Sequence, residues 1–127
     1  MFKSIYYYID KFNKDEIDKL DRLISIIYRN YSNKISEKEI KHLVDFCRSQ
    51  RRKVYISNNL KAAIKYNFDG LYIPSFNKSL AFQNIVKDNF EILGSAHNIV
   101  ELRTKEKQGC SVIFLSPIFE NDKKKNI

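Results

Sequence analysis

The 127-residue chain has no tryptophan and only two cysteines, two prolines and three glycines. Cys47 and Cys110 stand alone, since neither belongs to a CxxC pair or has a histidine at a metal-ligand spacing. We interpret both as thiols of a reducing compartment rather than as metal ligands or nucleophiles. The scarcity of glycine and proline, together with 43% hydrophobic residues, excludes a disordered or collagen-like chain.

Long apolar runs are also missing, because no run approaches the roughly 20 residues of a membrane-spanning helix. The first six residues, MFKSIY, lack the apolar core and the small-residue cleavage site of a signal peptide. The sequence therefore predicts a cytoplasmic protein without a membrane partner. No GxGxxG or GxxxxGK[ST] motif follows any expected strand, which removes support for a nucleotide-binding fold.

Acidic residues are outnumbered, with 23 Lys and Arg against 15 Asp and Glu, for a net charge of +8. The basic residues are scattered, and their densest run, residues 48–53, falls where a helix is expected to end. Cations there interact favourably with the helix dipole. We therefore disfavour a nucleic-acid partner, while an anionic partner for this run remains the alternative.

What the chain does have is a regular alternation of β-rich apolar runs with amphipathic segments. Strands are expected at residues 4–9, 24–28, 53–56, 70–73, 91–93 and 111–115. Helices are expected over 13–23, after a capping box at 36–39, over 60–66, over 79–87, and between 98 and Gly109. Continuous apolar strands of this kind are typical of a parallel sheet covered by helices.

The spacing of the strands predicts a single α/β domain over residues 1–127, built like a (βα) TIM barrel or a doubly wound sheet. The missing nucleotide motifs favour the barrel-like form. Six strands do not close a barrel of eight. Either the last two βα units are lacking, or the sheet stays open, or a second copy of the chain covers the open edge as a homo-oligomer.

Ligands of βα folds bind at the carboxyl ends of the strands. The polar residues that follow the expected strands are Asp10, Arg29, Asn30, Asn58, Asn59, Ser75, Asn77, Ser95, His97, Ser116, Asn121, Lys123 and Lys124. We expect them to converge on one face, where arginine and lysine side chains could hold a phosphate group. Ordinary loop and capping roles are the alternative for Asn58, Asn59 and His97. A solvated tail is the alternative for the lysines. We interpret Tyr6–Tyr8 as strand packing rather than as a surface on which a ligand stacks.

The residues at these strand ends also match, in order, the motifs of one known family. The matching residues are Arg29 in Q-L-R-E-K, Asn58 in I-V-N-D, Asp69 and Gly70 in D-G-V-H-L-G-Q-E-D, Ser95, His97 and Glu101 in G-x-S-x-H-S-x-x-E, and Pro117, Phe119 and Lys124 in G-P-V-F-x-T-x-T-K. On these residues the chain resembles the thiamine phosphate synthase/TenI family of eight-stranded barrels. The resemblance stops before the family's last two βα units.

The resemblance implies a transferase that joins hydroxymethylpyrimidine diphosphate to thiazole phosphate in thiamine biosynthesis and releases pyrophosphate. It implies substrate contacts for Arg29, Asn58, Ser95 and Lys124. His97, Asn121 and Lys123 are further candidates because they follow expected strands. It also implies Mg²⁺ at the positions of Asn59 and Asn77. The family has acids at both positions, and asparagine is a weaker Mg²⁺ ligand than aspartate. The sequence therefore leaves two functions open, a divergent synthase and a non-catalytic relative that binds phosphate or pyrophosphate without a metal.

Overall fold

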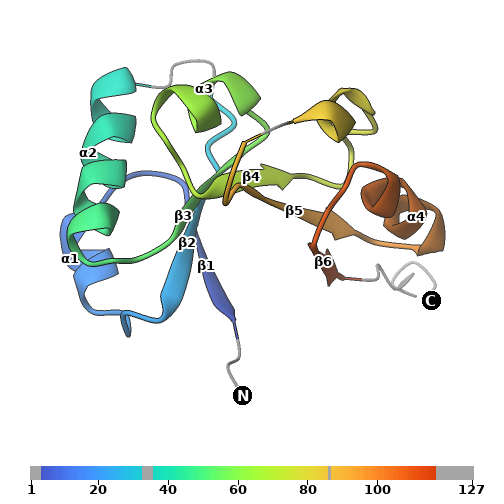
Figure 1. The fold of residues 1–127 in the computed structure, drawn as a ribbon. Helices are drawn as coiled ribbons and strands as arrows, with labels where there is room; N and C mark the ends of the chain where they lie inside the picture. Colours follow the sequence, from blue (N-terminus) through green and yellow to red (C-terminus); the bar gives the residue numbers. More distant parts are fainter. Residues whose placement is uncertain (1–3, 33–35, 86, 117–127) are drawn as a thin grey trace. The chain divides into compact units, whose positions relative to one another are not determined.

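Strands and helices alternate along the whole described chain in the computed structural model, which describes residues 4–32, 36–85 and 87–116. Figure 1 shows their arrangement. The elements are β1 (Ile5–Ile9), α1 (Lys14–Asp18), β2 (Ile24–Tyr28), α2 (Glu37–Ser49), β3 (Val54–Ser57), α3 (Leu60–Lys65), β4 (Gly70–Ile73), the 3₁₀ turn η1 (Ala81–Asn84), β5 (Glu91–Ala96), α4 (Ile99–Lys107) and β6 (Val112–Leu115). Each expected strand is present, within a few residues of its expected bounds.

The chain divides into two compact units, which are described separately. The first contains the described residues of Met1–Tyr72 and Lys87–Glu91, and the second those of Ile73–Val86 and Ile92–Ile127. In the first unit, β1, β2, β3 and β4 pair in parallel in the order of the sequence. In the second unit, β5 and β6 form a parallel pair. The expectation of one domain over residues 1–127 stays a prediction.

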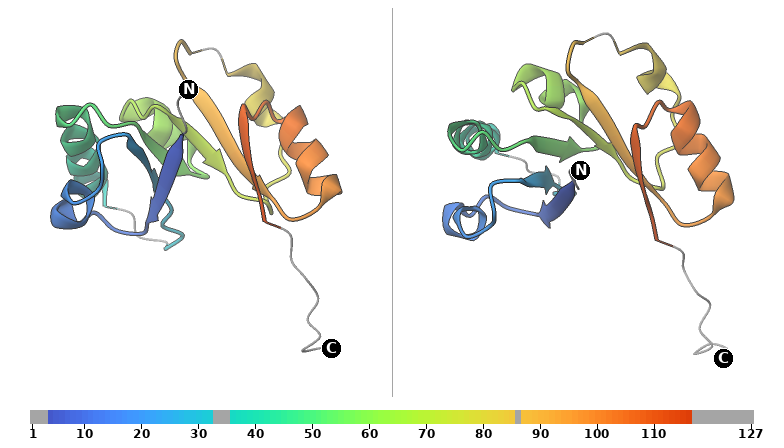
Figure 2. Two further views of the ribbon diagram at one scale, coloured as in Figure 1. Left: turned by 90° about the horizontal axis from the view of Figure 1, so that it is seen from below. Right: turned by 60° about the horizontal axis from the view of Figure 1, so that its bottom comes forward.

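The first unit has its apolar core between the sheet and its helices. The sides of β2 and β3 that carry Ile26 and Ile56 are fully buried, and α1 and α2 lie on one side of β1–β3 in Figures 1 and 2. Helix α2 contributes Leu43 and Cys47, both with no exposed surface. Burial raises the pKa of the Cys47 thiol to about 12, so this cysteine is an inert packing residue.

The other face of this sheet carries tyrosines and is called the inner face. Tyr6 and Tyr8 of β1 lie on it together with Tyr55 of β3 and Tyr72 of β4, as the strand register requires. The Tyr6 and Tyr55 rings are 6.0 Å apart and the Tyr8 and Tyr72 rings 5.6 Å apart. Since β1 is not adjacent to β3 or β4, these contacts require a sheet that curls around its inner face.

The basic run at the end of α2 is held mainly by contacts within the protein. Arg52 is 1% exposed, and its Nε donates to Gln50 Oε1 at 2.9 Å. Its two terminal nitrogens donate to four backbone carbonyls, those of Ile17, Leu20, Asp21 and Ile24. Arg52 therefore stabilises the turn after α1, a structural role that differs from the helix-dipole interaction expected for the run.

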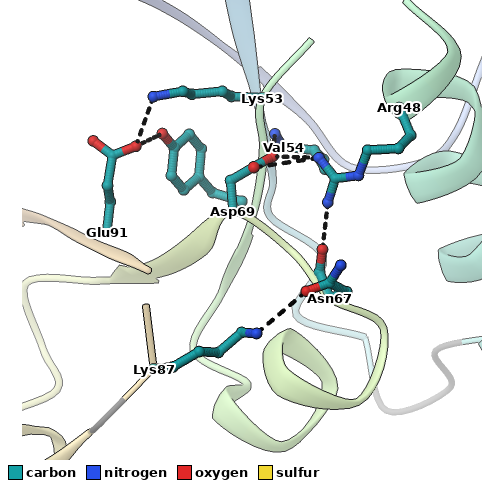
Figure 3. A network of polar contacts seen from close by, with 8 residues as sticks. Arg48, Lys53, Val54, Asn67, Asp69, Lys87 and Glu91 are labelled. Carbon is teal, nitrogen blue, oxygen red and sulfur yellow. Dashed lines mark hydrogen bonds and ion pairs between the residues drawn. The ribbon is translucent and has the colours of Figure 1, made fainter. Parts of the chain in front are cut away.

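A network of polar contacts joins the amino-terminal ends of the strands in the first unit, as Figure 3 shows. Arg48 pairs with Asp69 at 3.1 Å and also donates to the Asn67 carbonyl. Asp69 accepts the backbone N–H of Val54 at 2.8 Å. One carboxylate thus fixes the end of α2 against the start of β3.

Glu91 is the second acid of the same network. It accepts Lys53 Nζ at 3.1 Å and the Tyr55 hydroxyl at 2.7 Å, while Lys87 donates to the Asn67 side chain at 3.3 Å (Figure 3). Burial raises the pKa of Glu91, but the hydrogen bonds from Tyr55 and Lys53 outweigh it and leave this pKa below its usual value. In barrel-like folds this end of the sheet serves stability rather than chemistry.

The second unit packs α4 against β5 and β6, with α4 on one side of this strand pair in Figure 2. Two buried polar side chains, one in α4 and one at its C-cap, hold the segment that follows β4. Lys105 Nζ and Gln108 Nε2 both donate to the Asn77 carbonyl, at 2.9 and 2.8 Å. Burial lowers the pKa of Lys105. Gly109, at φ 90°, ends the helix as expected.

Two expected helices are shorter than the sequence pattern suggested. The helix over 13–23 ends at Asp18, since the turn after it is closed by the Leu23 N–H, which donates to the Asp21 side chain at 2.9 Å. The helix over 79–87 is reduced to η1, because Ser79 Oγ accepts the Ala81 N–H at 3.1 Å and competes with helical hydrogen bonds. Both expectations were wrong for the same reason, local side-chain hydrogen bonds.

Candidate functional site

The candidate site of the first unit lies where β1 and β2 end. The Arg29 N–H donates to the Ile9 carbonyl at 2.7 Å, so the strand pairing continues to the first residue after β2. An open pocket of about 310 Å³ lies beside it, lined by Tyr8, Ile9, Asp10, Glu16 and Arg29. We call it the Arg29 pocket. Asp10 and Arg29, which the sequence placed after two different strands, are thereby brought to one cavity.

Arg29 lies over an aromatic ring. Its guanidinium carbon is 4.2 Å from the centre of the Tyr8 ring, within the range of a cation–π interaction. Within the described part of the chain, Arg29 forms no ion pair and no side-chain hydrogen bond. Its N–H groups therefore remain available to an anionic ligand.

Tyr8 is in turn held from β4. Its ring meets Tyr72 edge-on, with an angle of 78° between the ring planes, and its hydroxyl donates to the Tyr72 hydroxyl at 3.4 Å. Burial and the contact with Tyr72 raise the pKa of Tyr8, so its ring stays neutral at physiological pH. The sequence analysis interpreted Tyr6–Tyr8 as strand packing and therefore missed the contact of Tyr8 with Arg29. The signal for it was the alternation that puts Tyr6 and Tyr8 on one face.

The pocket also has acidic walls. Glu16 Oε2 accepts the Tyr7 hydroxyl at 2.7 Å, and this bond raises the pKa of Tyr7. Asp10 makes no hydrogen bond or ion pair with any other described residue. The pocket thus combines one cation with two carboxylates.

Two predicted residues follow β3. Asn58 adopts a left-handed backbone conformation, with φ 57°, and its N–H donates to the Tyr72 carbonyl at 2.8 Å. Asn59 is the N-cap of α3, because its Oδ1 accepts the Ala62 N–H at 3.0 Å. The capping alternative therefore applies to Asn59, and Asn58 forms the turn between strand and helix.

Three further described candidates belong to the second unit. Asn77 Oδ1 accepts the Ser79 N–H at 2.9 Å. Ser95 lies inside β5 and not after it, because this strand runs to Ala96. His97 precedes the N-cap of α4, its N–H donates to Glu101 Oε1 at 2.7 Å, and its Nδ1 is 3.3 Å from the same oxygen.

Three predicted residues, Asn121, Lys123 and Lys124, lie outside the described residues. The same holds for Pro117 and Phe119 of the last family motif. The roles of these residues, like those of Arg29, Asn58 and Ser95 toward a substrate, stay predictions.

The residues at the two family metal positions fit Mg²⁺ poorly. The side-chain oxygens of Asn59 and Asn77 are neutral, and each already accepts a backbone N–H. Mg²⁺ is usually held by carboxylates and phosphate oxygens. Within the described ranges, no group of three or more His, Cys, Asp or Glu side chains is placed to hold a metal ion. We therefore assign no chemical step to a metal here.

Comparison with known proteins identifies the fold and the family. A thiamine phosphate pyrophosphorylase from Pyrococcus furiosus matches with a TM-score of 0.70 and 16% identity, over 94% of this chain and 62% of that chain. This likeness and the alternating strands define a TIM-barrel-like α/β protein. Residues 20–127 match the family model described as thiamine monophosphate synthase. The chain belongs to this thiamine monophosphate synthase (TMP-TENI) family.

A curated relative supports the same family. The thiamine-phosphate synthase of Prochlorococcus marinus is 26% identical over 89 residues, which are 69% of this chain and 26% of that protein. This chain therefore spans less than two thirds of either protein that it matches. The resemblance read from the strand-end motifs is confirmed at the level of the family and the fold. Among the described residues, no helix has the length and apolar character needed to cross a membrane.

Proposed function

We propose that the protein binds a phosphorylated precursor of thiamine in the Arg29 pocket and that this binding needs no divalent metal ion. One observation carries the proposal. The Arg29 guanidinium lies over Tyr8 beside an open pocket and forms no ion pair with a described carboxylate. Arginine keeps its charge at any physiological pH, and its planar group of donors matches the oxygens of a phosphate.

The acidic walls of the pocket favour one of the two precursors. A bare anion would meet Asp10 and Glu16 as well as Arg29. A ligand that carries both an anionic group and an amino group would complement both charges. Hydroxymethylpyrimidine diphosphate has a diphosphate and a ring amino group, whereas thiazole phosphate has no amino group. The pyrimidine diphosphate is therefore the ligand that we propose.

Independence of metal follows from the side chains at the family metal positions. The side-chain oxygens of Asn59 and Asn77 are neutral and accept capping and turn hydrogen bonds, so they are poor ligands for the Mg²⁺ that would neutralise a diphosphate. In their place, the positive charge that the ligand requires comes from Arg29. Binding should accordingly be the same in EDTA and in Mg²⁺, apart from the effect of Mg²⁺ on the free diphosphate.

Titration calorimetry with the 127-residue chain tests this proposal. We expect hydroxymethylpyrimidine diphosphate to bind in EDTA and thiazole phosphate to bind more weakly. Arg29→Ala should weaken binding by roughly tenfold or more, the value of a hydrogen-bonded charge. Arg22→Ala, which removes an exposed arginine outside the pocket, is the matched control. The proposal fails if folded protein binds no diphosphate or if Arg29→Ala binds as well as the unchanged protein.

The synthase reaction is the second candidate function. It is favoured by the family match and by Ser95 and His97 at their motif positions. In this reaction the thiazole nitrogen attacks the pyrimidine methylene carbon, a C–N bond forms, and the C–O bond to the diphosphate breaks with release of pyrophosphate. Thiamine phosphate formation from both precursors with Mg²⁺ would support it. Absence of product from folded protein that binds the pyrimidine diphosphate would exclude catalysis and leave binding intact.

A further inference from the structure

Arg29 contacts a tyrosine of β1, and this tyrosine contacts a second one from β4, a strand that is not paired with β1. Tyr8 projects from β1 onto the inner face, and its ring lies 4.2 Å from the guanidinium carbon. Tyr8 itself is 37% exposed, so its ring is only partly covered by the rest of the protein. Arginine has many accessible rotamers in water, and stacking on an aromatic face restricts them.

The anchor of this arrangement is Tyr72. It is only 3% exposed and meets Tyr8 both edge-on and through the two hydroxyls. Its backbone carbonyl accepts the Asn58 N–H, which ties the anchor to the turn after β3.

We propose that Tyr8, held by Tyr72, is a positioning residue that presents the Arg29 guanidinium to the diphosphate of the ligand. This role rests on the proposed function, because it concerns the same pocket. Tyr8 acts through Arg29, and its ring, not its hydroxyl, is the part that matters for the arginine. The hydroxyl serves the contact with Tyr72.

Three variants separate this role from simple packing. Tyr8→Leu removes the aromatic face, whereas Tyr8→Phe keeps it and loses only the hydroxyl. Tyr6→Leu is the matched control, since Tyr6 lies on the same strand and the same face but packs against Tyr55 instead of an arginine. A packing role alone would make Tyr6→Leu and Tyr8→Leu alike.

The first measurement is the NMR signal of the Arg29 Nε–H group, assigned from its loss in Arg29→Lys. A proton above a ring face is shielded, so we expect an upfield shift and restricted motion in the unchanged protein. The shift should persist in Tyr8→Phe and Tyr6→Leu and disappear in Tyr8→Leu. An unshifted, mobile signal in the unchanged protein would overturn the proposal without any variant, even if Tyr8→Leu fails to fold.

The second measurement is calorimetry with hydroxymethylpyrimidine diphosphate in EDTA. Tyr8→Leu should bind about threefold to tenfold more weakly, the range of a cation–π contact. Tyr8→Phe and Tyr6→Leu should bind nearly as the unchanged protein does. Folded Tyr8→Leu that binds normally would overturn the positioning role alone. Absence of binding by the unchanged protein would instead refute the proposed function and the positioning role that rests on it.

Discussion

The guanidinium of Arg52 donates a hydrogen bond to the carbonyl of Ile17 across 35 positions of the sequence, at 3.2 Å. Ile17 is the buried residue of α1, a helix of five residues. The same guanidinium also binds the carbonyls of the turn that follows α1. A single buried cation therefore holds one carbonyl of α1 and two carbonyls of the turn after it, where the end of a helix leaves backbone acceptors open.

Replacement of Arg52 should destabilise the protein strongly. Arg52→Lys keeps the charge but cannot reach the same set of carbonyls, so we expect the free energy of unfolding to fall by about 2 kcal/mol or more. Urea denaturation followed by circular dichroism measures this change. Arg51→Lys, at an exposed neighbouring position, should have little effect. Equal stability of the two variants would contradict the role of Arg52.

Gly70 is expected to tolerate no side chain. A Cβ atom there would lie 1.9 Å from the Glu91 carbonyl oxygen and 2.9 Å from the Tyr55 ring. Gly109 gives the comparison, because a Cβ there meets no atom within 4 Å and only its φ of 90° is unfavourable. Gly109→Ala should cost about 1 kcal/mol, and Gly70→Ala considerably more. Thermal denaturation of both variants checks this order, and the reverse order would refute the close approach of Gly70 to Glu91 and Tyr55.

Stability should fall in acid, in part through Glu91. Burial alone would raise the pKa of Glu91, but the hydrogen bonds from Tyr55 and Lys53 lower it below its ordinary value of 4.5. A carboxylate with a depressed folded-state pKa contributes stability above its unfolded pKa. That contribution is lost as the pH falls through the folded-state pKa.

Urea denaturation at several pH values below about 5 tests this linkage. Glu91→Gln should be less stable than the unchanged protein at neutral pH, and the difference should shrink as the pH is lowered. Glu106→Gln, an exposed acid on α4, is the control and should leave the pH dependence unchanged. A constant difference between Glu91→Gln and the unchanged protein at all pH values would argue against the shifted pKa.

The acidic wall of the Arg29 pocket should control ligand preference. Asp10→Asn removes one negative charge beside Arg29, so inorganic pyrophosphate should bind more tightly than to the unchanged protein. The advantage of hydroxymethylpyrimidine diphosphate over pyrophosphate should then decrease. Competition calorimetry in EDTA measures both affinities. Asp15→Asn, on α1 but outside the pocket lining, should change neither, and an unaltered preference in Asp10→Asn would remove Asp10 from the site.

The sequence predicted the strands well because they are continuous apolar runs, and such runs depend little on distant partners. It predicted the lengths of two helices poorly. The side chains of Asp21 and Ser79 accept nearby backbone N–H groups, and these bonds compete with the helix. The spacing of apolar residues carries no information about such bonds. The shortening of α1 also depends on Arg52, which reaches it from beyond α2.

The candidate site could be predicted only in part for a related reason. Arg29 was identified, because a polar residue after a strand and a motif position point to it. The role of Tyr8 depends on curvature that brings β1 against β4, and the strand pattern does not show this contact. For Asn59 the sequence left two interpretations open, a ligand-binding residue and a helix cap. Its hydrogen bond agrees with the cap.

The contact between Arg52 and α1 also bears on how the protein opens. A helix of five residues is far too short to persist alone. Because Arg52 binds the Ile17 carbonyl of α1 and two carbonyls of the turn that follows, α1 and the segment before β3 should open as one cooperative unit. The hydrogen-exchange rates of the α1 amides would then depend on how often the segment after α2, which carries Arg52, opens.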